Sequence, residues 1–245
     1  MKQTSGVERT NFTRKVTNRL GFWSAVLTAL FAAAAFAVGI TTPPRSGPFC
    51  ASSCITYPYT DAAAFVPRDY LWMYPGIVLA MTFVVLMACV YNYSQDDKKV
   101  FSQIGFSFAS ISVALIIMDY FIQLSVMQPS LLKGEIEDLS LFSQYNPHGI
   151  FIALEDLGYL MMSMSFLFAG LVLVGGKGLE RAIGWLFIVS SLVAIGALIG
   201  LALLYGKDLE YRFEVTVLTI NWTVLIAAGA LLSVLFKRAE RFGPS

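Results

Sequence analysis

Six apolar runs constrain the fold of this chain more than any other feature of its sequence. Each run is about 20 residues long, the length at which a helix crosses the roughly 30 Å hydrocarbon core of a bilayer. The runs are continuously apolar and lack the alternating polarity of membrane-barrel strands, so we expect helices. The predicted spans are residues 21–41, 71–91, 104–127, 150–174, 182–204 and 215–236.

Composition supports the same class of protein. Hydrophobic residues make up 57% of the 245 residues and charged residues 13%, outside the usual balance of soluble domains. A basic stretch precedes the first span, but that span is longer than a signal-peptide core and no small-residue cleavage site follows, so we expect a retained helix. The sequence therefore predicts an all-α integral membrane protein, a six-transmembrane-helix bundle forming one domain over residues 1–245.

The orientation follows from the placement of lysine and arginine. With six spans both termini share one side, and that side holds twelve of the 17 basic residues. The positive-inside rule then predicts cytoplasmic termini, in a plasma or inner membrane, with two long extracytoplasmic loops over residues 42–70 and 128–149. The net charge of +1 gives no indication of nucleic-acid binding. The twelve residues are Lys2, Arg9, Arg14, Lys15, Arg19, Lys98, Lys99, Lys177, Arg181, Lys237, Arg238 and Arg241.

The first outside loop contains Cys50 and Cys54. In an oxidising compartment we expect a disulfide between them, with free thiols as the alternative. A zinc site is disfavoured because no second Cys or His pair lies nearby. Cys89 falls inside the second span and is expected to pack there.

Several features of the outside face and the fifth span suggest contacts. Ile136, Leu139 and Phe142 have helical spacing and predict a short amphipathic turn on the membrane surface. In the fifth span, the small residues Gly184, Gly196 and Gly200 predict close helix contact inside the bundle, with a homo-oligomer face as the alternative. We also expect six aromatic residues to form an interfacial belt. They are Tyr57, Tyr59, Tyr70, Trp72, Tyr74 and Tyr145.

Polar side chains interrupt three spans near their outer ends. Asp119 and Gln123 lie four residues apart on one face of the third span. Asn221 enters the sixth span from the same side to a similar depth, and Glu155 and Asp156 lie in the outer part of the fourth. An ionised carboxylate costs several kcal/mol in hydrocarbon unless it is paired, hydrated or protonated. We therefore expect a polar pocket that opens to the extracytoplasmic side.

The fourth span is predicted to start at Asn146 and Pro147, which suit the cap and first position of a helix. From that start Glu155 would lie about 13 Å along the helix. The single histidine, His148, is seven residues before Glu155 and would share its face, and Ser163 would continue the stripe inward. Asp119, Glu155, Asp156 and His148 are the candidate acid–base groups. The candidate ligand contacts are Gln123, Asn221, Ser163, Arg68, Tyr70 and Trp72. The alternative is that these side chains only hydrogen-bond between helices.

Several chemistries are excluded by the sequence. One histidine cannot build a multi-histidine zinc site or a pair of axial haem ligands. Dinucleotide-binding, phosphate-loop and GxSxG serine signatures are missing, and no lysine lies deep in a span. A divalent cation held by Asp119, Glu155 and Asp156 stays open as a minor alternative. No cofactor is identified.

Three functions remain open. The first is a pocket in the bilayer that binds a small molecule or lipid, with acid–base chemistry by the carboxyl groups. The second is proton- or cation-coupled transport, which the lack of an internal repeat and of an inner polar path disfavours. The third is a non-catalytic sensor or assembly partner whose outside surface includes Arg68, Tyr70 and Trp72.

Overall fold

The computed structural model describes the backbone of residues 3–242 and the side chains of residues 14–241. Six long helices are each apolar and long enough to cross a membrane, which confirms the prediction of an all-helical multipass membrane protein. The long helices are α1 (Gln3–Ile40), α2 (Met73–Tyr93), α3 (Lys99–Ile122), α5 (Ile150–Leu173), α6 (Leu179–Tyr205) and α7 (Tyr211–Phe242).

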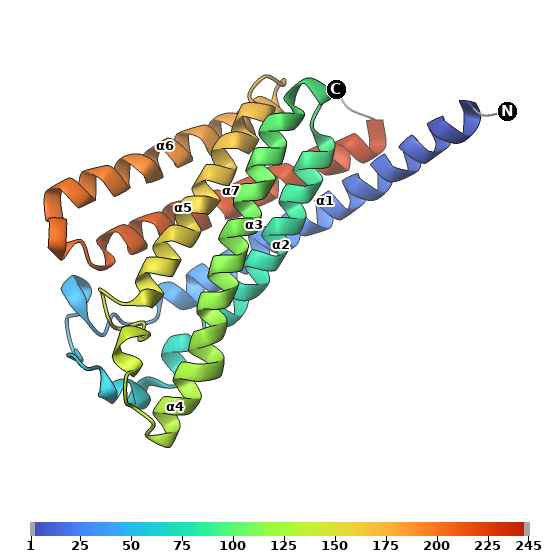
Figure 1. Ribbon diagram of the computed structural model, residues 1–245. Helices are drawn as coiled ribbons and strands as arrows, with labels where there is room; N and C mark the ends of the chain where they lie inside the picture. Colours follow the sequence, from blue (N-terminus) through green and yellow to red (C-terminus); the bar gives the residue numbers. More distant parts are fainter. Residues whose placement is uncertain (1–2, 243–245) are drawn as a thin grey trace.

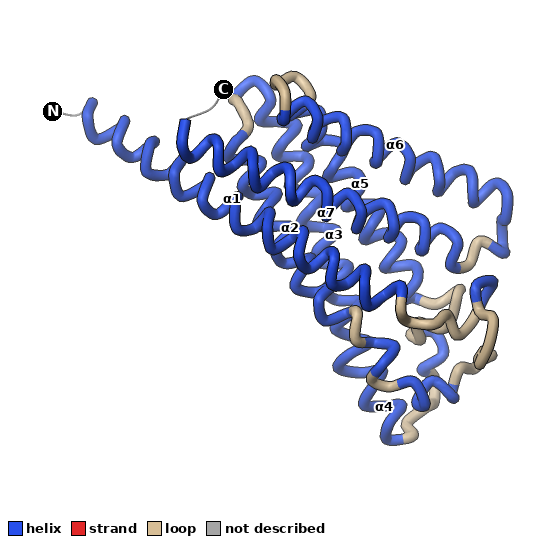
Figure 2. The backbone as a smooth tube through the Cα atoms, turned by 180° about the vertical axis from the view of Figure 1, so that it is seen from behind, coloured by secondary structure: helices blue, strands red, loops and turns tan. Residues whose placement is uncertain are grey.

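The helices form a ring in the order α1, α2, α3, α5, α6, α7, and α5 also contacts α7 across it. In Figure 1, α1 begins and α7 ends at one end of the bundle, here called the terminal end. The segments between α1 and α2 and before α5 gather at the opposite, loop end. There α6 and α7 diverge from α3, and the view from behind in Figure 2 shows the connecting segments between these separated helix ends. The bundle is thus widest at the loop end.

The third predicted span extends further than the sequence indicated. After α3 the chain makes a π-helical turn at Gln123–Met127 and continues as the short helix α4 (Gln128–Lys133). Gly134 ends this helix with a φ of +73°, a conformation that glycine adopts without steric cost. The second loop therefore covers only residues 134–149. Within it, the predicted amphipathic turn is reduced to a single 3-10 turn at Leu139–Leu141.

Helices α5 and α6 approach closely at a pair of glycines. A Cβ atom on Gly184 would lie 2.4 Å from the backbone nitrogen of Val174, and one on Gly170 would lie 2.8 Å from the carbonyl oxygen of Gly184. Small residues allow this approach, and van der Waals packing then holds the helices together in a bilayer. The predicted contact inside the bundle is wrong for Gly196 and Gly200, because an added Cβ there meets no atom of the described chain within 4 Å. The homo-oligomer face stays a prediction.

The last turn of α6, at the loop end, is exposed. Leu203 and Leu204 have exposed fractions of 83% and 78%. Large exposed apolar side chains of this kind are tolerated where lipid, not water, covers the surface. This face supports the assignment of the chain to the membrane.

Substituting alanine at the two kinds of glycine tests this packing. We expect Gly184→Ala to destabilise the protein by about 1–3 kcal/mol, because its Cβ would overlap backbone atoms that cannot rotate away. Gly196→Ala is the matched control on the same helix, and should leave stability unchanged or slightly raised. Thermal unfolding in detergent micelles, followed by circular dichroism, measures both. Equal melting temperatures for the two variants would contradict the packing described.

Candidate functional site

A cavity of about 440 Å³ lies at the loop end, between the end of α1, the start of α7 and the two connecting segments. Its walls are mainly apolar and aromatic, with three charged residues among them. Cavities of this size are typical of small-molecule sites. It is lined by Phe36, Gly39, Ile40, Thr42, Pro43, Pro44, Arg45, Ser46, Phe49, Asp69, Trp72, Gln144, Tyr145, Tyr211, Glu214, Val215, Leu218, Thr219 and Trp222.

Hydrogen bonds among three segments hold these walls in place. Ser46 donates to the carbonyl oxygen of Tyr145 at 2.6 Å, and its hydroxyl lies 2.7 Å from that of Tyr211. Tyr211 in turn donates to the carbonyl oxygen of Gln144 at 3.3 Å. Gly47 follows with a φ of +65°, and a Cβ there would lie 2.5 Å from the Tyr211 ring, so the position requires glycine. These bonds join the segment between α1 and α2, the segment before α5, and α7 around the cavity.

A buried ion pair forms part of the wall. The Arg45 guanidinium donates to Asp69 at 3.0 Å and lies 4.0 Å above the ring of Phe65. Tyr145 donates to the same Asp69 oxygen at 3.4 Å. Burial, together with the neighbouring Tyr70 and Asp69, raises the pKa of Tyr145, so its hydroxyl keeps its proton and remains a donor. The other Asp69 oxygen accepts from the exposed Arg68 at 3.2 Å, so two arginines share this carboxylate.

Behind the cavity wall a chain of donors ends on Glu155. Trp222 donates through its indole N–H to the hydroxyl of Tyr159 at 2.8 Å, and the Tyr159 and Tyr120 hydroxyls are 3.0 Å apart. Tyr120 donates to Oε1 of Glu155. The carboxyl of Glu155 also lies close enough to the carboxyl of Glu214, which lines the cavity, for direct electrostatic interaction. The network therefore leads from one cavity wall residue, Trp222, through the bundle interior to another, Glu214.

Two buried acids of this region have no basic partner. Among residues 14–241 the buried charged side chains are Asp69, which pairs with Arg45 and Arg68, and Asp119 and Glu155, which form no ion pair. One carboxyl oxygen of each of Asp119, Glu155 and Asp156 accepts no hydrogen bond: Oδ2, Oε2 and Oδ1 respectively. Asp119 and Asp156 both lie close enough to Glu155 for direct electrostatic interaction. The predicted acids of α3 and α5 are thus brought together, around Glu155.

Glu214 is the site residue that the sequence prediction missed. The sixth span was predicted to begin at residue 215, which placed Glu214 in a polar loop, whereas α7 begins at Tyr211. The available signal was its spacing from Asn221 and Trp222, seven and eight residues later on the same helical face.

Asn221 and Ser163 belong to a set of hydrogen bonds that joins α5, α6 and α7. The Asn221 amide donates to the Ser163 hydroxyl at 3.0 Å and to the Val217 carbonyl at 2.8 Å. Ser191 of α6 donates to the carbonyl of Ser163 at 2.7 Å. These side chains use their hydrogen-bonding capacity within α5, α6 and α7, and neither Asn221 nor Ser163 lines the cavity.

The prediction for His148 is wrong in its geometry. α5 begins at Ile150, so His148 precedes the helix and does not share the face of Glu155. Its backbone N–H donates to the Asn146 side chain at 3.0 Å, and its ring nitrogen lies 3.3 Å from the carbonyl oxygen of Lys207. The side chain is exposed at the loop end. With the later start, Glu155 lies about 8 Å along the helix.

The other predicted ligand contacts lie partly on the surface and partly in the loop layer, the two connecting segments that cover the loop end of the bundle. Gln123 is buried and donates to the carbonyl oxygen of Phe142 at 2.7 Å. Arg68 is exposed and donates to Asp69 and to the carbonyl oxygen of Thr41. Trp72 lines the cavity and packs edge-on against Tyr120, with the ring centroids 5.0 Å apart.

Three residues of the predicted aromatic belt lie inside the protein. Tyr70, Trp72 and Tyr145 have exposed fractions of 0%, 8% and 5%, because the two connecting segments fold over the helix ends and enclose them. Tyr57 and Tyr74 are exposed. The belt prediction is therefore wrong for the three buried residues, which support the loop layer and the cavity.

Cys50 and Cys54 form a disulfide in the first connecting segment, and Cys89 is a buried free thiol. Within the described part of the chain, no three His, Cys, Asp or Glu side chains are grouped so as to hold a metal ion. The acids around Glu155 thus do not form the divalent-cation site considered from the sequence.

Comparisons with known proteins add no functional information. The chain matches no protein-family model, and searches of curated proteins and of solved structures find no similar protein. The function must therefore be argued from the site itself.

Replacing Asn221 tests whether its role is structural. We expect Asn221→Ala to lower the free energy of unfolding by about 1–3 kcal/mol, because it removes interhelical hydrogen bonds at a buried position. Ser233→Ala, which removes a hydrogen bond made only within α7, should have little effect. Thermal unfolding in detergent provides the comparison. An unchanged melting temperature in Asn221→Ala would argue against a structural role.

Proposed function

We propose that this membrane protein binds a small amphiphilic molecule or a lipid in the cavity between α1 and α7. The observation that carries the proposal is the position of Glu214: it lines the cavity and reaches a buried carboxyl, Glu155, that has no basic partner. Burying such acids without counter-ions is costly. A ligand that supplies polar contacts to Glu214 would offset part of that cost.

The surroundings of the cavity favour a ligand that comes from the bilayer. Ile40 at the end of α1 and Val215 near the start of α7 both line the cavity, and their exposed fractions are 70% and 47%. They belong to membrane-length helices, so the cavity is bordered by a surface that lipid would cover. An amphiphile could place its polar group near Glu214 and leave its apolar part between these two residues.

The carboxyl groups of Glu155 and Glu214 can also bind and release a proton. Two neighbouring carboxyl groups satisfy each other when one proton lies between them. We propose that Glu155 and Glu214 share such a proton and that Tyr120 stabilises the charge by donating to Glu155. A bound ligand that changes the charge at Glu214 would change the protonation of the pair, which is the acid–base property assigned to this site.

Transport across the bilayer has less support. All the buried charged-type side chains of the described residues lie at the loop end, and the buried polar groups toward the terminal end are hydroxyls and Asn18. A proton or cation path normally continues through ionisable side chains or water-lined polar groups. Binding at one side of the membrane therefore fits the distribution better than passage through it.

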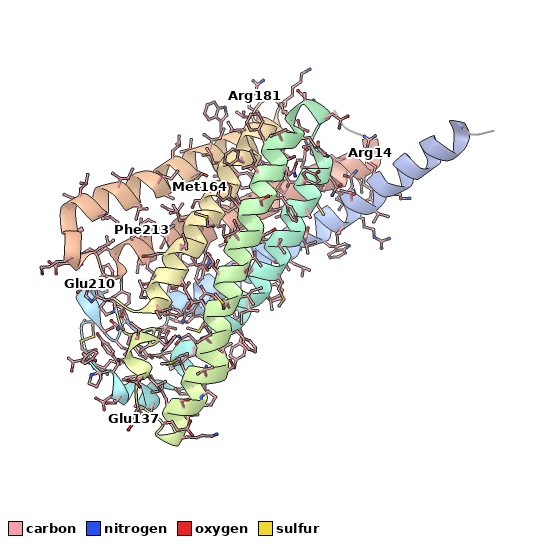
Figure 3. The ribbon with its side chains drawn as sticks, in the orientation of Figure 1. Arg14, Glu137, Met164, Arg181, Glu210 and Phe213 are labelled. Atoms are coloured by element: carbon pink, nitrogen blue, oxygen red, sulfur yellow. A yellow bond between two sulfur atoms is a disulfide. The ribbon has the colours of Figure 1, made fainter. Side chains whose placement is uncertain are left out.

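We further propose that the loop end is extracytoplasmic and the terminal end cytoplasmic, in a plasma or inner membrane. Twelve of the 17 basic residues are predicted on the side of the termini, and two of the exposed ones, Arg14 and Arg181, lie toward the terminal end in Figure 3. This asymmetry agrees with the positive-inside rule. The disulfide in the loop layer agrees with an oxidising compartment.

Photolabelling tests binding in the cavity. A decyl amphiphile carrying a diazirine in its chain should label residues 36–49 and 211–222, as mapped by peptide mass spectrometry. Leu218→Trp, which places a larger side chain in the cavity, should reduce that labelling, whereas Val234→Trp on the outward face of α7 should not. Labelling confined to the exposed face of α6, or unchanged by Leu218→Trp, would contradict the proposal.

Cysteine labelling tests the orientation. In intact cells a membrane-impermeant maleimide should modify the Glu137→Cys variant, because that position is exposed at the loop end. The Lys177→Cys variant should react only after the membrane is opened, and the wild-type protein serves as the background, with Cys50 and Cys54 bonded and Cys89 buried. The reverse pattern would place the loop end in the cytoplasm.

A further inference from the structure

The chemical class of the ligand can be argued from the charges that face the cavity. Of the three charged residues in its walls, Arg45 and Asp69 are 3.0 Å apart and form an ion pair. Glu214 forms no ion pair within the described part of the chain, nor do the nearby acids Glu155 and Asp119. The wall therefore has one carboxyl for which the protein supplies no cation.

The basic residues nearest to Glu214 in the chain are engaged elsewhere. Arg212 lies 3.7 Å from Glu210 and 4.3 Å above the ring of Tyr205. Lys207 pairs with Asp208 and its side chain is 88% exposed. An intramolecular counter-ion for Glu214 is thus absent among the residues described on the neighbouring turns.

The remaining walls suit a cation that has lost its water shell. Trp72 and Trp222 both line the cavity with their ring centroids 6.0 Å apart, and Tyr145, Tyr211 and Phe36 contribute further rings. Aromatic faces attract ammonium groups, by roughly 0.5–2 kcal/mol per contact depending on desolvation. An anionic headgroup would meet the Glu214 carboxyl, and the Arg45 guanidinium is already held by Asp69 and the Phe65 ring. The combination of one free carboxyl and several aromatic rings selects for positive charge.

Resting on the proposed function of the cavity, we infer that its ligand is an organic ammonium ion with an apolar tail. The ammonium group pairs with Glu214 and lies against the rings of Trp72 and Trp222. The tail leaves the cavity past Ile40 and Val215 toward the lipid. With the cation bound, Glu214 is ionised and the proton shared with Glu155 is released or kept on Glu155.

Tryptophan fluorescence provides a test confined to the cavity. The chain has four tryptophans, and Trp23 and Trp185 are both 54% exposed outside the cavity. In a Trp23→Phe, Trp185→Phe background only the two cavity tryptophans report. The protein, in phosphatidylcholine nanodiscs, is titrated with three probes of equal chain length: decyltrimethylammonium, decyl maltoside and decanoate. Empty nanodiscs correct for partitioning.

We expect the cation to bind at least about tenfold more tightly than the neutral and anionic probes, the factor that corresponds to about 1.4 kcal/mol. Glu214→Gln should reduce the affinity for the cation to that of decyl maltoside, while Glu137→Gln, at an exposed acid of the loop end, should leave it unchanged. Saturable binding of all three probes with equal affinity would overturn the inference and leave the cavity function standing. If no probe gives a saturable change, the proposed function fails as well.

Discussion

The burial of Glu155 between three membrane helices is the constraint on which the rest of the site depends. Its side chain is fully inaccessible, yet among residues 14–241 it receives a hydrogen bond from Tyr120 and forms no ion pair. The donors behind Tyr120 all point the same way, from Trp222 through Tyr159 toward the carboxyl. A network with a single acceptor at its end holds α3, α5 and α7 in one arrangement at this depth.

Different contacts hold the helices together at the two ends of the bundle. Toward the terminal end, close approach at Gly170 and Gly184 and ordinary packing join the helices. Toward the loop end the helices separate, and the connecting segments take over their contacts through Ser46, Tyr145 and Tyr211. The cavity lies at the loop end. Its shape therefore depends on connecting segments that are themselves hydrogen-bonded to α7.

The sequence was sufficient to predict the six helices because a membrane span requires about 20 apolar residues in a row. It also located Asp119, Glu155 and Asp156, since an acid within such a run is rare. It could not locate Glu214, because the apolar run begins one residue later and an acid outside a run is unremarkable. Nor could it distinguish Asn221, whose hydrogen bonds are used up inside the bundle, from a ligand contact, because that depends on partners from distant segments.

The central claim is that Glu155 and Glu214 act as one unit that holds a shared proton. Infrared spectroscopy of the purified protein measures it directly, through the C=O stretching band of protonated carboxyl groups, which ionised carboxylates lack. We expect such a band at neutral pH, with one component that Glu155→Gln removes and Glu214→Gln shifts, beside any component from Asp119 and Asp156. A spectrum that either substitution leaves unchanged would contradict the account.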